Sequence, residues 1–172
     1  MVALRRGSTS VKQFAPPLEP GVYAIFLDSH ATLPMVNPGA DRLLYLGSGS
    51  ILSERILETH FTDGKTDSST LRRTIGAILK AELRLVAIPR SRDSDPDKFK
   101  FTNDGEMSLT NWMVRNLLAS WYACRDFEKI EEELISQYKP PLNLDKWCNP
   151  DRERIKSLRK LCADEARSRD RI

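Results

Sequence analysis

The chain has 172 residues, of which 40% are hydrophobic and 30% charged, an ordinary balance for one globular domain with a real core. No apolar run is long enough to span a bilayer, and the three cysteines form no CxxC pair, which supports neither a disulfide framework nor a zinc site. Composition therefore argues against a membrane-spanning or disulfide-rich secreted protein, and we expect a reduced cytoplasmic one.

The formal charge of +3 is unevenly distributed. Residues 146–172 hold nine Lys or Arg against five Asp or Glu, and the rest of the chain is close to neutral. Positive charge concentrated at one end suits a polyanionic partner, although a solvated basic helix explains it equally well. Residues 1–18 contain Arg5 and Arg6 without a following apolar segment, which argues against a secretory signal and predicts a flexible leader.

Short apolar strands are predicted at residues 21–28 and 41–47, joined by a loop rich in Pro, Asn and Gly. Because no crossover helix separates these two strands, we expect them to pair in antiparallel fashion. A further strand is predicted at 121–124, and residues 99–101 are a candidate for a small additional one.

Five segments carry a helical pattern of apolar residues. They are residues 51–61, 69–83, 109–118, 126–138 and 151–166. Ser68 or Ser69 is a suitable N-cap for the second of these helices. The fourth helix has to end before Pro140 and Pro141, since two prolines cannot continue it.

Glu131 is the most informative residue, because its carboxylate falls within the apolar stripe of the helix predicted at 126–138. Phe127 and Leu134 lie on the same face at helical spacing. A buried carboxylate is costly unless it is paired or bound to a cation. A hydrated metal ion would satisfy Glu131, and so would an arginine such as Arg55, and the pattern leaves both open.

Two tyrosines, an arginine and an asparagine complete a constellation around Glu131. The triplets GVY (residues 21–23) and YLG (residues 45–47) each contain a tyrosine and a glycine, Arg55 lies ten residues after Tyr45, and Asn143 lies twelve residues after Glu131. This order and spacing resemble the GIY-YIG nuclease family, with one conservative substitution in the middle of each triplet. The resemblance covers roughly residues 21–144.

The resemblance implies an α/β (α+β) fold in which a small three-stranded antiparallel sheet is flanked by helices. It implies a leader at 1–18, a nuclease domain at 19–145, and a basic helical extension at 146–172 packed on the same domain. The implied activity is that of a divalent-metal-dependent endonuclease, a hydrolase of DNA phosphodiester bonds. A catalytically weak or inactive nucleic-acid-binding module on the same fold is the alternative.

The resemblance also implies roles for the residues of the constellation. Glu131 would be the one protein ligand of a mostly hydrated Mg²⁺ or Mn²⁺, which agrees with the preference of Mg²⁺ for few carboxylates and several waters. Arg55 would stabilise charge on the phosphate. Tyr23 would activate the attacking water and Tyr45 would steady the phosphate. Asn143 would hold the site together.

His60 is a further catalytic candidate whose position departs from the family pattern. Many members carry a histidine or tyrosine four residues after the arginine, where this chain has Thr59. Five residues separate Arg55 from His60, which is about 140° on an α-helix, so the two share a face only if the helix bulges or ends there. A lysine that some members place after the second triplet is replaced by Ser48.

Candidate nucleic-acid contacts are the basic residues of the second and the last predicted helices. They are Arg72, Arg73, Arg152, Arg154, Lys156, Arg159 and Lys160. The expected partner is the DNA phosphate backbone, with no membrane, and a homodimer or a recruiting partner protein would help to select the target. The sequence does not separate DNA from RNA, or repair, restriction and mobile-element roles from one another.

Overall fold

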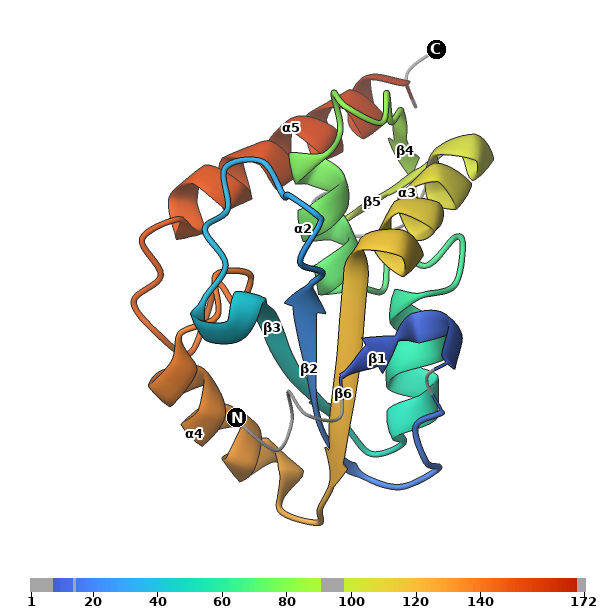
Figure 1. The fold of residues 1–172 in the computed structure, drawn as a ribbon. Helices are drawn as coiled ribbons and strands as arrows, with labels where there is room; N and C mark the ends of the chain where they lie inside the picture. Colours follow the sequence, from blue (N-terminus) through green and yellow to red (C-terminus); the bar gives the residue numbers. More distant parts are fainter. Residues whose placement is uncertain (1–7, 14, 91–97, 170–172) are drawn as a thin grey trace.

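The computed structural model describes residues 8–13, 15–90 and 98–169. Its centre is a four-stranded antiparallel sheet in the order β1-β6-β2-β3, and β4 and β5 form a separate two-stranded antiparallel sheet (Figure 1). The strands are β1 Thr9–Ser10, β2 Gly21–Leu27, β3 Leu43–Gly49, β4 Ala87–Pro89, β5 Phe99–Phe101 and β6 Leu117–Ala123.

Helices surround this sheet, and the mixture confirms the predicted α+β class. The short helices are η1 Val11–Gln13 and η2 Ala40–Arg42, both 3₁₀, and the π-helix η3 Glu54–His60. The α-helices are α2 Thr70–Ile78, α3 Asn103–Asn116, α4 Phe127–Tyr138 and α5 Arg152–Arg169. In the part of the chain that the structure describes, no helix has the length and apolar character needed to cross a membrane.

The central sheet has one strand more than the three that the sequence analysis expects. The additional strand β1 pairs with β6, with Thr9 opposite Ala119 and Ser10 opposite Leu118. It comes from the predicted leader at 1–18, and Val11 beside it is buried in the core. The leader prediction is therefore wrong for residues 9–11, because two polar residues carry no strand signal, while residues 1–7 and 14 lie outside the described part.

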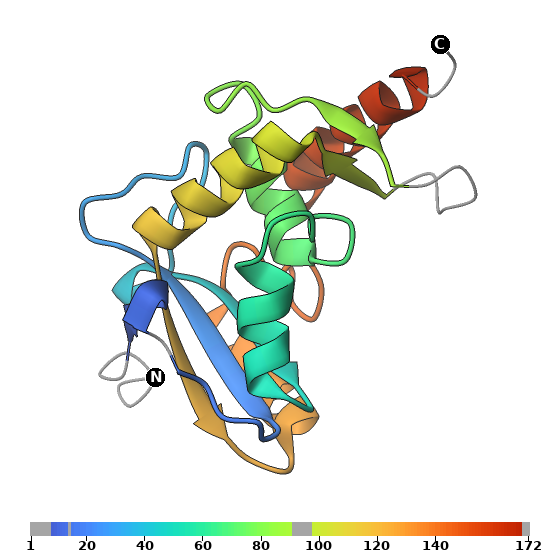
Figure 2. The same cartoon turned by 90° about the vertical axis from the view of Figure 1, so that its right-hand side faces the viewer.

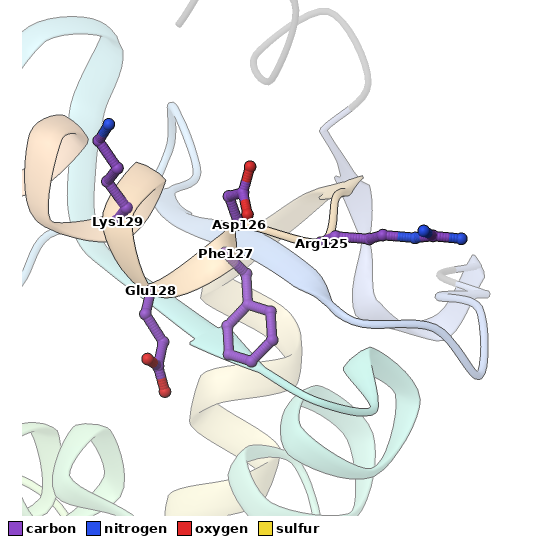
Figure 3. Close-up of a pocket in the computed structure, with 5 residues that line it drawn as sticks. All are labelled: Arg125, Asp126, Phe127, Glu128 and Lys129. Carbon is purple, nitrogen blue, oxygen red and sulfur yellow. The ribbon is translucent and has the colours of Figure 1, made fainter.

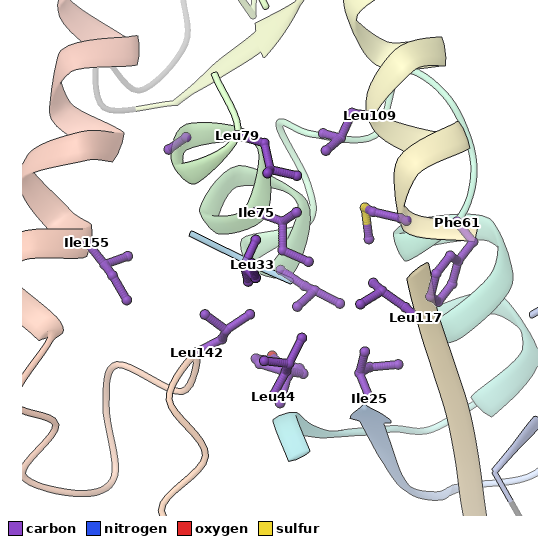
Figure 4. Close-up of a cluster of buried hydrophobic side chains, with 14 of the residues drawn as sticks. Ile25, Leu33, Leu44, Phe61, Ile75, Leu79, Leu109, Leu117, Leu142 and Ile155 are labelled. Atoms are coloured by element: carbon purple, nitrogen blue, oxygen red, sulfur yellow. The ribbon is translucent and has the colours of Figure 1, made fainter. Parts of the chain in front are cut away.

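Strand β2 runs through the middle of the sheet and divides two apolar cores. Ala24 and Phe26 face α4, where they meet Ile135. Ile25 points the other way, into a larger cluster that lies against η3, α2 and α3 and reaches Ile155 of α5 (Figures 2 and 4). The alternation is the period of two expected for a strand. Both faces of the sheet are thus covered, and α5 runs beside α2 and β4 (Figure 1).

At the junction of α3 and β6, the end of the helix and the start of the strand differ from the predicted boundaries. The helix predicted at 109–118 begins at Asn103 and ends at Asn116, and the strand predicted at 121–124 begins directly afterwards at Leu117. Asn116 Nδ2 donates to the carbonyl of Trp112 at 2.8 Å and closes the last helical turn. Leu117 then pairs with Leu27 of β2, so strand pairing overrides the helical pattern there.

Candidate active site

Tyr23 and Tyr45 are diagonal neighbours on the two central strands. Tyr23 lies opposite Gly47, and Tyr45 lies opposite Ile25. The two phenol rings have centroids 6.2 Å apart, within the reach of diagonal side chains on one face of a sheet. Tyr23 is fully buried, whereas Tyr45 is 8% exposed. Of the two phenols, Tyr45 is therefore the one that solvent can reach.

Two glycines of β3 make room for these functional side chains. A Cβ on Gly47 would lie 2.3 Å from the hydroxyl oxygen of Tyr23, and a Cβ on Gly49 would lie 2.9 Å from the Cβ of Arg55. Contacts that short do not occur between real atoms, so a larger residue at either position would displace its neighbour. The glycine of the YLG triplet is thus explained by the tyrosine of the GVY triplet.

The helix after β3 is a π-helix, and this places Arg55 and His60 on one face. The i→i+5 pattern of a π-helix puts residues five apart about one turn apart. The helical bulge that His60 needs in order to share a face with Arg55 is therefore present. His60 is fully buried, its Nε2 lies 2.6 Å from the hydroxyl oxygen of Tyr23, and its Nδ1 lies 2.7 Å from Ser69 Oγ.

Burial dominates the acid–base properties of this cluster. Burial raises the pKa of Tyr23 well above its ordinary value, although the nearby Arg55 lowers it in part. The pKa of Tyr45 is raised by burial as well, against the opposing effect of Arg55. Burial, together with the positive charges of Arg55 and Arg72, holds the pKa of His60 well below 6.5. His60 is therefore a neutral imidazole at physiological pH.

Glu131 borders a hollow of about 150 Å³, here called the central hollow, which is also lined by Tyr45, Asn143, Lys146 and Arg159. Its side chain is 15% exposed. Oε2 of Glu131 accepts hydrogen bonds from Ser48 Oγ at 3.2 Å and from Lys146 Nζ at 2.9 Å. The cation that pairs with Glu131 is thus Lys146 from the C-terminal segment, and not Arg55, which the sequence analysis considered.

The groups around Glu131 fit only a metal ion that takes most of its ligands from water. The described residues contain no group of three or more His, Cys, Asp or Glu, so an ion held entirely by protein side chains has no support there. Both protein contacts of the Glu131 carboxylate go to Oε2, which leaves Oε1 as a potential ligand. A hydrated Mg²⁺ that uses one carboxylate fits this arrangement.

Asn143 fixes the outer edge of β3. Its Oδ1 accepts from the backbone N–H of Leu46 at 2.9 Å, and its Nδ2 donates to the carbonyl of Leu46 at 2.8 Å. The side chain thus pairs with the strand as a neighbouring backbone would. The carbonyl of Asn143 in turn accepts from Trp147 Nε1 at 2.7 Å and from Asn149 Nδ2 at 2.9 Å. Asn143 therefore positions Tyr45, the neighbour of Leu46.

Arg72 and Arg73, expected as phosphate contacts, point into the protein. Arg72 is fully buried, forms an ion pair with Glu106 at 2.7 Å and donates to the carbonyl of His60. Arg73 is also buried and donates to backbone carbonyls of residues 66–67. The expectation is wrong for Arg72, because its carboxylate partner lies 34 residues away in the sequence and no local pattern indicates it. Arg73 is turned toward the backbone in the same way.

The basic residues of α5 fall into two groups. Arg152 and Arg154 are each paired with nearby carboxylates. Lys156, Arg159 and Lys160 instead line a second hollow of about 390 Å³, and Arg159 borders the central hollow as well. The basic residues predicted to contact nucleic acid therefore differ in whether carboxylates already hold them. Lys156, Arg159 and Lys160 form a basic surface that adjoins the candidate site.

Another hollow, of about 340 Å³, lies where β6 turns into α4 and is lined by residues 125–129 (Figure 3). None of the predicted site residues lines it. This hollow is therefore separate from the candidate site.

A known family model matches most of the chain. Residues 21–165 match the family model described as the GIY-YIG catalytic domain. The matched range contains both tyrosines, the arginine, the glutamate and the asparagine of the constellation. No significant match was found among curated proteins or among solved structures. Because the family match spans more than half of the chain, this protein belongs to the GIY-YIG catalytic domain family.

Proposed function

We propose that this protein is a divalent-metal-dependent endonuclease that hydrolyses phosphodiester bonds in DNA. Membership of the GIY-YIG family makes nuclease chemistry the expected activity. The observation that supports the proposal is the meeting of a phenol, a guanidinium and a carboxylate from three separate elements. Tyr45 and Glu131 border the central hollow, and Arg55 lies close enough to both tyrosines to lower their pKa values.

Tyr45 is the residue that we propose to activate the attacking water. The sequence analysis gave this role to Tyr23, but Tyr23 is fully buried and Tyr45 borders the central hollow. A phenolate on Tyr45 would take a proton from water, and Arg55 would stabilise both that phenolate and the charge developing on the phosphate. Glu131 would hold the metal ion, which when bound polarises the phosphate and favours departure of the leaving oxygen.

The direct test is incubation of the full chain with supercoiled plasmid and Mg²⁺ or Mn²⁺. We expect nicked and linear products, and their loss on addition of a chelator. A labelled single-stranded RNA and a DNA of the same sequence, assayed in parallel, separate the two substrate classes. Intact DNA across a range of metals, pH values and sequences would contradict the proposal.

The alternative is a nucleic-acid-binding module with weak or no catalysis. The ion pair of Lys146 with Glu131 favours it, since an ammonium group there competes with a metal ion for the carboxylate. Salt-sensitive DNA binding without cleavage would support this alternative, because phosphate contacts release counterions.

The basic surface of α5 provides a test of the DNA path. Arg159 borders both hollows, so a backbone that leaves the central hollow there would meet Lys156 and Lys160. Replacing these three residues by alanine is expected to weaken DNA binding and to reduce the salt slope of the binding constant by about 1 per lost phosphate contact. Fluorescence anisotropy across a salt series measures both quantities.

Arg152→Ala combined with Arg154→Ala is the matched control for the α5 triple variant. Since carboxylates already hold these two arginines, we expect little change in the salt slope. An equal effect in the two sets would mean that general charge, and no specific path, governs binding.

Gly47→Ala tests whether the packing of Tyr23 against β3 matters for activity. The new Cβ would lie 2.3 Å from the Tyr23 hydroxyl oxygen, so the phenol has to move, which disturbs its 2.6 Å contact with His60 Nε2. We expect a loss of about 1–3 kcal/mol in the free energy of unfolding and a fall of about 100-fold in cleavage. Urea unfolding and plasmid cleavage measure the two effects.

Gly39→Ala is the control for this substitution, because a Cβ there meets nothing closer than 3.4 Å and the backbone φ is −65°. We expect it to leave both quantities nearly unchanged. Wild-type stability and cleavage in Gly47→Ala would remove the steric explanation for the glycine of the second triplet.

We also propose a cytoplasmic location and a target chosen with the help of a second copy or a recruiting partner. The location is supported by Cys124, Cys148 and Cys162, which are all free thiols. One site per chain cuts one strand at a time, so breakage of both strands calls for two copies or two successive events. The dependence of linear product on protein concentration distinguishes these cases.

A further inference from the structure

Ser69 connects the candidate site to the start of α2 through one hydroxyl group. As the N-cap of α2, its Oγ accepts a hydrogen bond from the backbone N–H of Arg72 at 3.1 Å. The same oxygen lies 2.7 Å from Nδ1 of His60. Ser69 is fully buried, so its hydroxyl group makes no hydrogen bond to bulk water. Every hydrogen bond of this group is therefore made within the protein.

The number of donors decides where the proton of this hydroxyl points. Ser69 Oγ has one proton to donate, and it already accepts from Arg72. If Nδ1 of His60 carried the imidazole proton, two donors would point at Oγ and the Ser69 proton would have no acceptor among its contacts, which is costly in a buried site. The Ser69 proton therefore points at Nδ1. His60, being neutral, then carries its single ring proton on Nε2.

The orientation of His60 fixes that of Tyr23. Nε2–H of His60 then donates to the Tyr23 hydroxyl oxygen at 2.6 Å, and the positive charge of Arg55 also acts on this phenol and lowers its pKa. The Tyr23 proton then points away from His60, and Tyr45, whose ring centroid lies 6.2 Å from that of Tyr23, is the neighbouring phenol. A Tyr23 hydroxyl oriented in this way favours a phenolate on Tyr45, since Tyr23 lowers the pKa of Tyr45.

We propose that Ser69 is a positioning residue, which holds His60 as the Nε2-protonated tautomer so that hydrogen bonds run outward from Ser69 through His60 to Tyr23, the neighbour of Tyr45 on the sheet. The tautomer itself is independent of the enzymatic activity, while its benefit to catalysis rests on the proposed function. In this arrangement His60 is a donor to Tyr23 and cannot accept the proton of Tyr23. The proton taken from the attacking water ends on the oxygen of Tyr45.

Two-bond ¹H–¹⁵N correlation spectra of the labelled full chain report the tautomer of each histidine. The chain has two histidines, and His30 is exposed, so it serves as the internal reference. We expect wild-type His60 to give the pattern of the Nε2-protonated form. Ser69→Gly removes the hydroxyl but keeps a residue tolerated at an N-cap, and the Nδ1-protonated form should become detectable. Ser69→Thr keeps a hydroxyl and should restore the wild-type pattern.

Kinetics of the same variants give a second readout. We expect kcat to fall about tenfold in Ser69→Gly with KM nearly unchanged, and to recover in Ser69→Thr, because only water activation is affected. Nδ1-protonated His60 in the wild type would overturn the inference. An unchanged tautomer in Ser69→Gly would also overturn it, and Ser69 would then only cap α2.

The outcomes separate this inference from the proposed function. A wild-type chain that cleaves no nucleic acid, yet shows the Nε2-protonated His60 and loses it in Ser69→Gly, supports the role of Ser69 and contradicts the proposed nuclease. If Ser69→Gly does not fold, the spectra of the wild type and of Ser69→Thr decide, because the Nδ1-protonated form in either one overturns the inference.

Discussion

Replacing Glu131 by glutamine is expected to lower the rate of plasmid cleavage by about 10³-fold, equivalent to about 4 kcal/mol of transition-state stabilisation. The amide keeps the shape of the side chain and can still accept from Ser48 Oγ, but it has lost the charge that a divalent ion needs. The ion pair with Lys146 is partly exposed, so its loss should change the free energy of unfolding little. Activity and stability are thus expected to separate.

Glu132→Gln is the matched control, since Glu132 follows Glu131 on α4, is 65% exposed and also lies 3.6 Å from Lys146 Nζ. It should cleave DNA at nearly the wild-type rate. Titration with Mn²⁺, followed by water proton relaxation, measures metal binding without any reaction. Normal Mn²⁺ affinity and normal cleavage in Glu131→Gln would show that this carboxylate is no metal ligand.

The two central strands were predictable because each is a short apolar run bounded by turn residues. β2 ends within one residue of its prediction, whereas β3 lies two residues later than predicted. The shift arises because Asp41 and Arg42 adopt left-handed backbone conformations in the preceding turn, with φ of 58° and 65°. Ser48 and Gly49 stay in the strand because they pair with β2, which polarity and small size do not reveal.

The candidate site was predictable where its residues belong to short motifs, and unpredictable where contacts are distant. The tyrosines, Arg55 and Glu131 were proposed as site residues from their order along the chain. Nothing in the pattern at 51–61 distinguishes a π-helix from an α-helix. The place of His60 in the site, where it contacts Tyr23, could therefore be predicted only on the assumption that this helix bulges. Lys146, read as part of a basic extension, reaches Glu131 only because the chain folds back after α4.

Arg72→Ala is expected to lower the free energy of unfolding by about 3–5 kcal/mol, whereas a phosphate contact would mainly affect DNA binding. The ion pair of Arg72 with Glu106 is 0% and 3% exposed at its two side chains. Removing the guanidinium leaves a buried carboxylate without its cation. Arg72 Nε also donates to Thr66 Oγ1 at 3.3 Å, so the loop before α2 loses this contact as well.

The double variant Arg72→Ala with Glu106→Ala is the control, and it should recover part of the lost stability because it removes the uncompensated charge. Urea unfolding and DNA binding across a salt series distinguish the two roles. Unchanged unfolding with a smaller salt slope would restore Arg72 as a phosphate contact. Alanine keeps the backbone N–H that Arg72 donates to Ser69, but it removes the guanidinium N–H that Arg72 donates to the carbonyl of His60. The loss of this guanidinium contact with His60 should lower cleavage even in the fraction that stays folded, because His60 in turn contacts the Tyr23 hydroxyl.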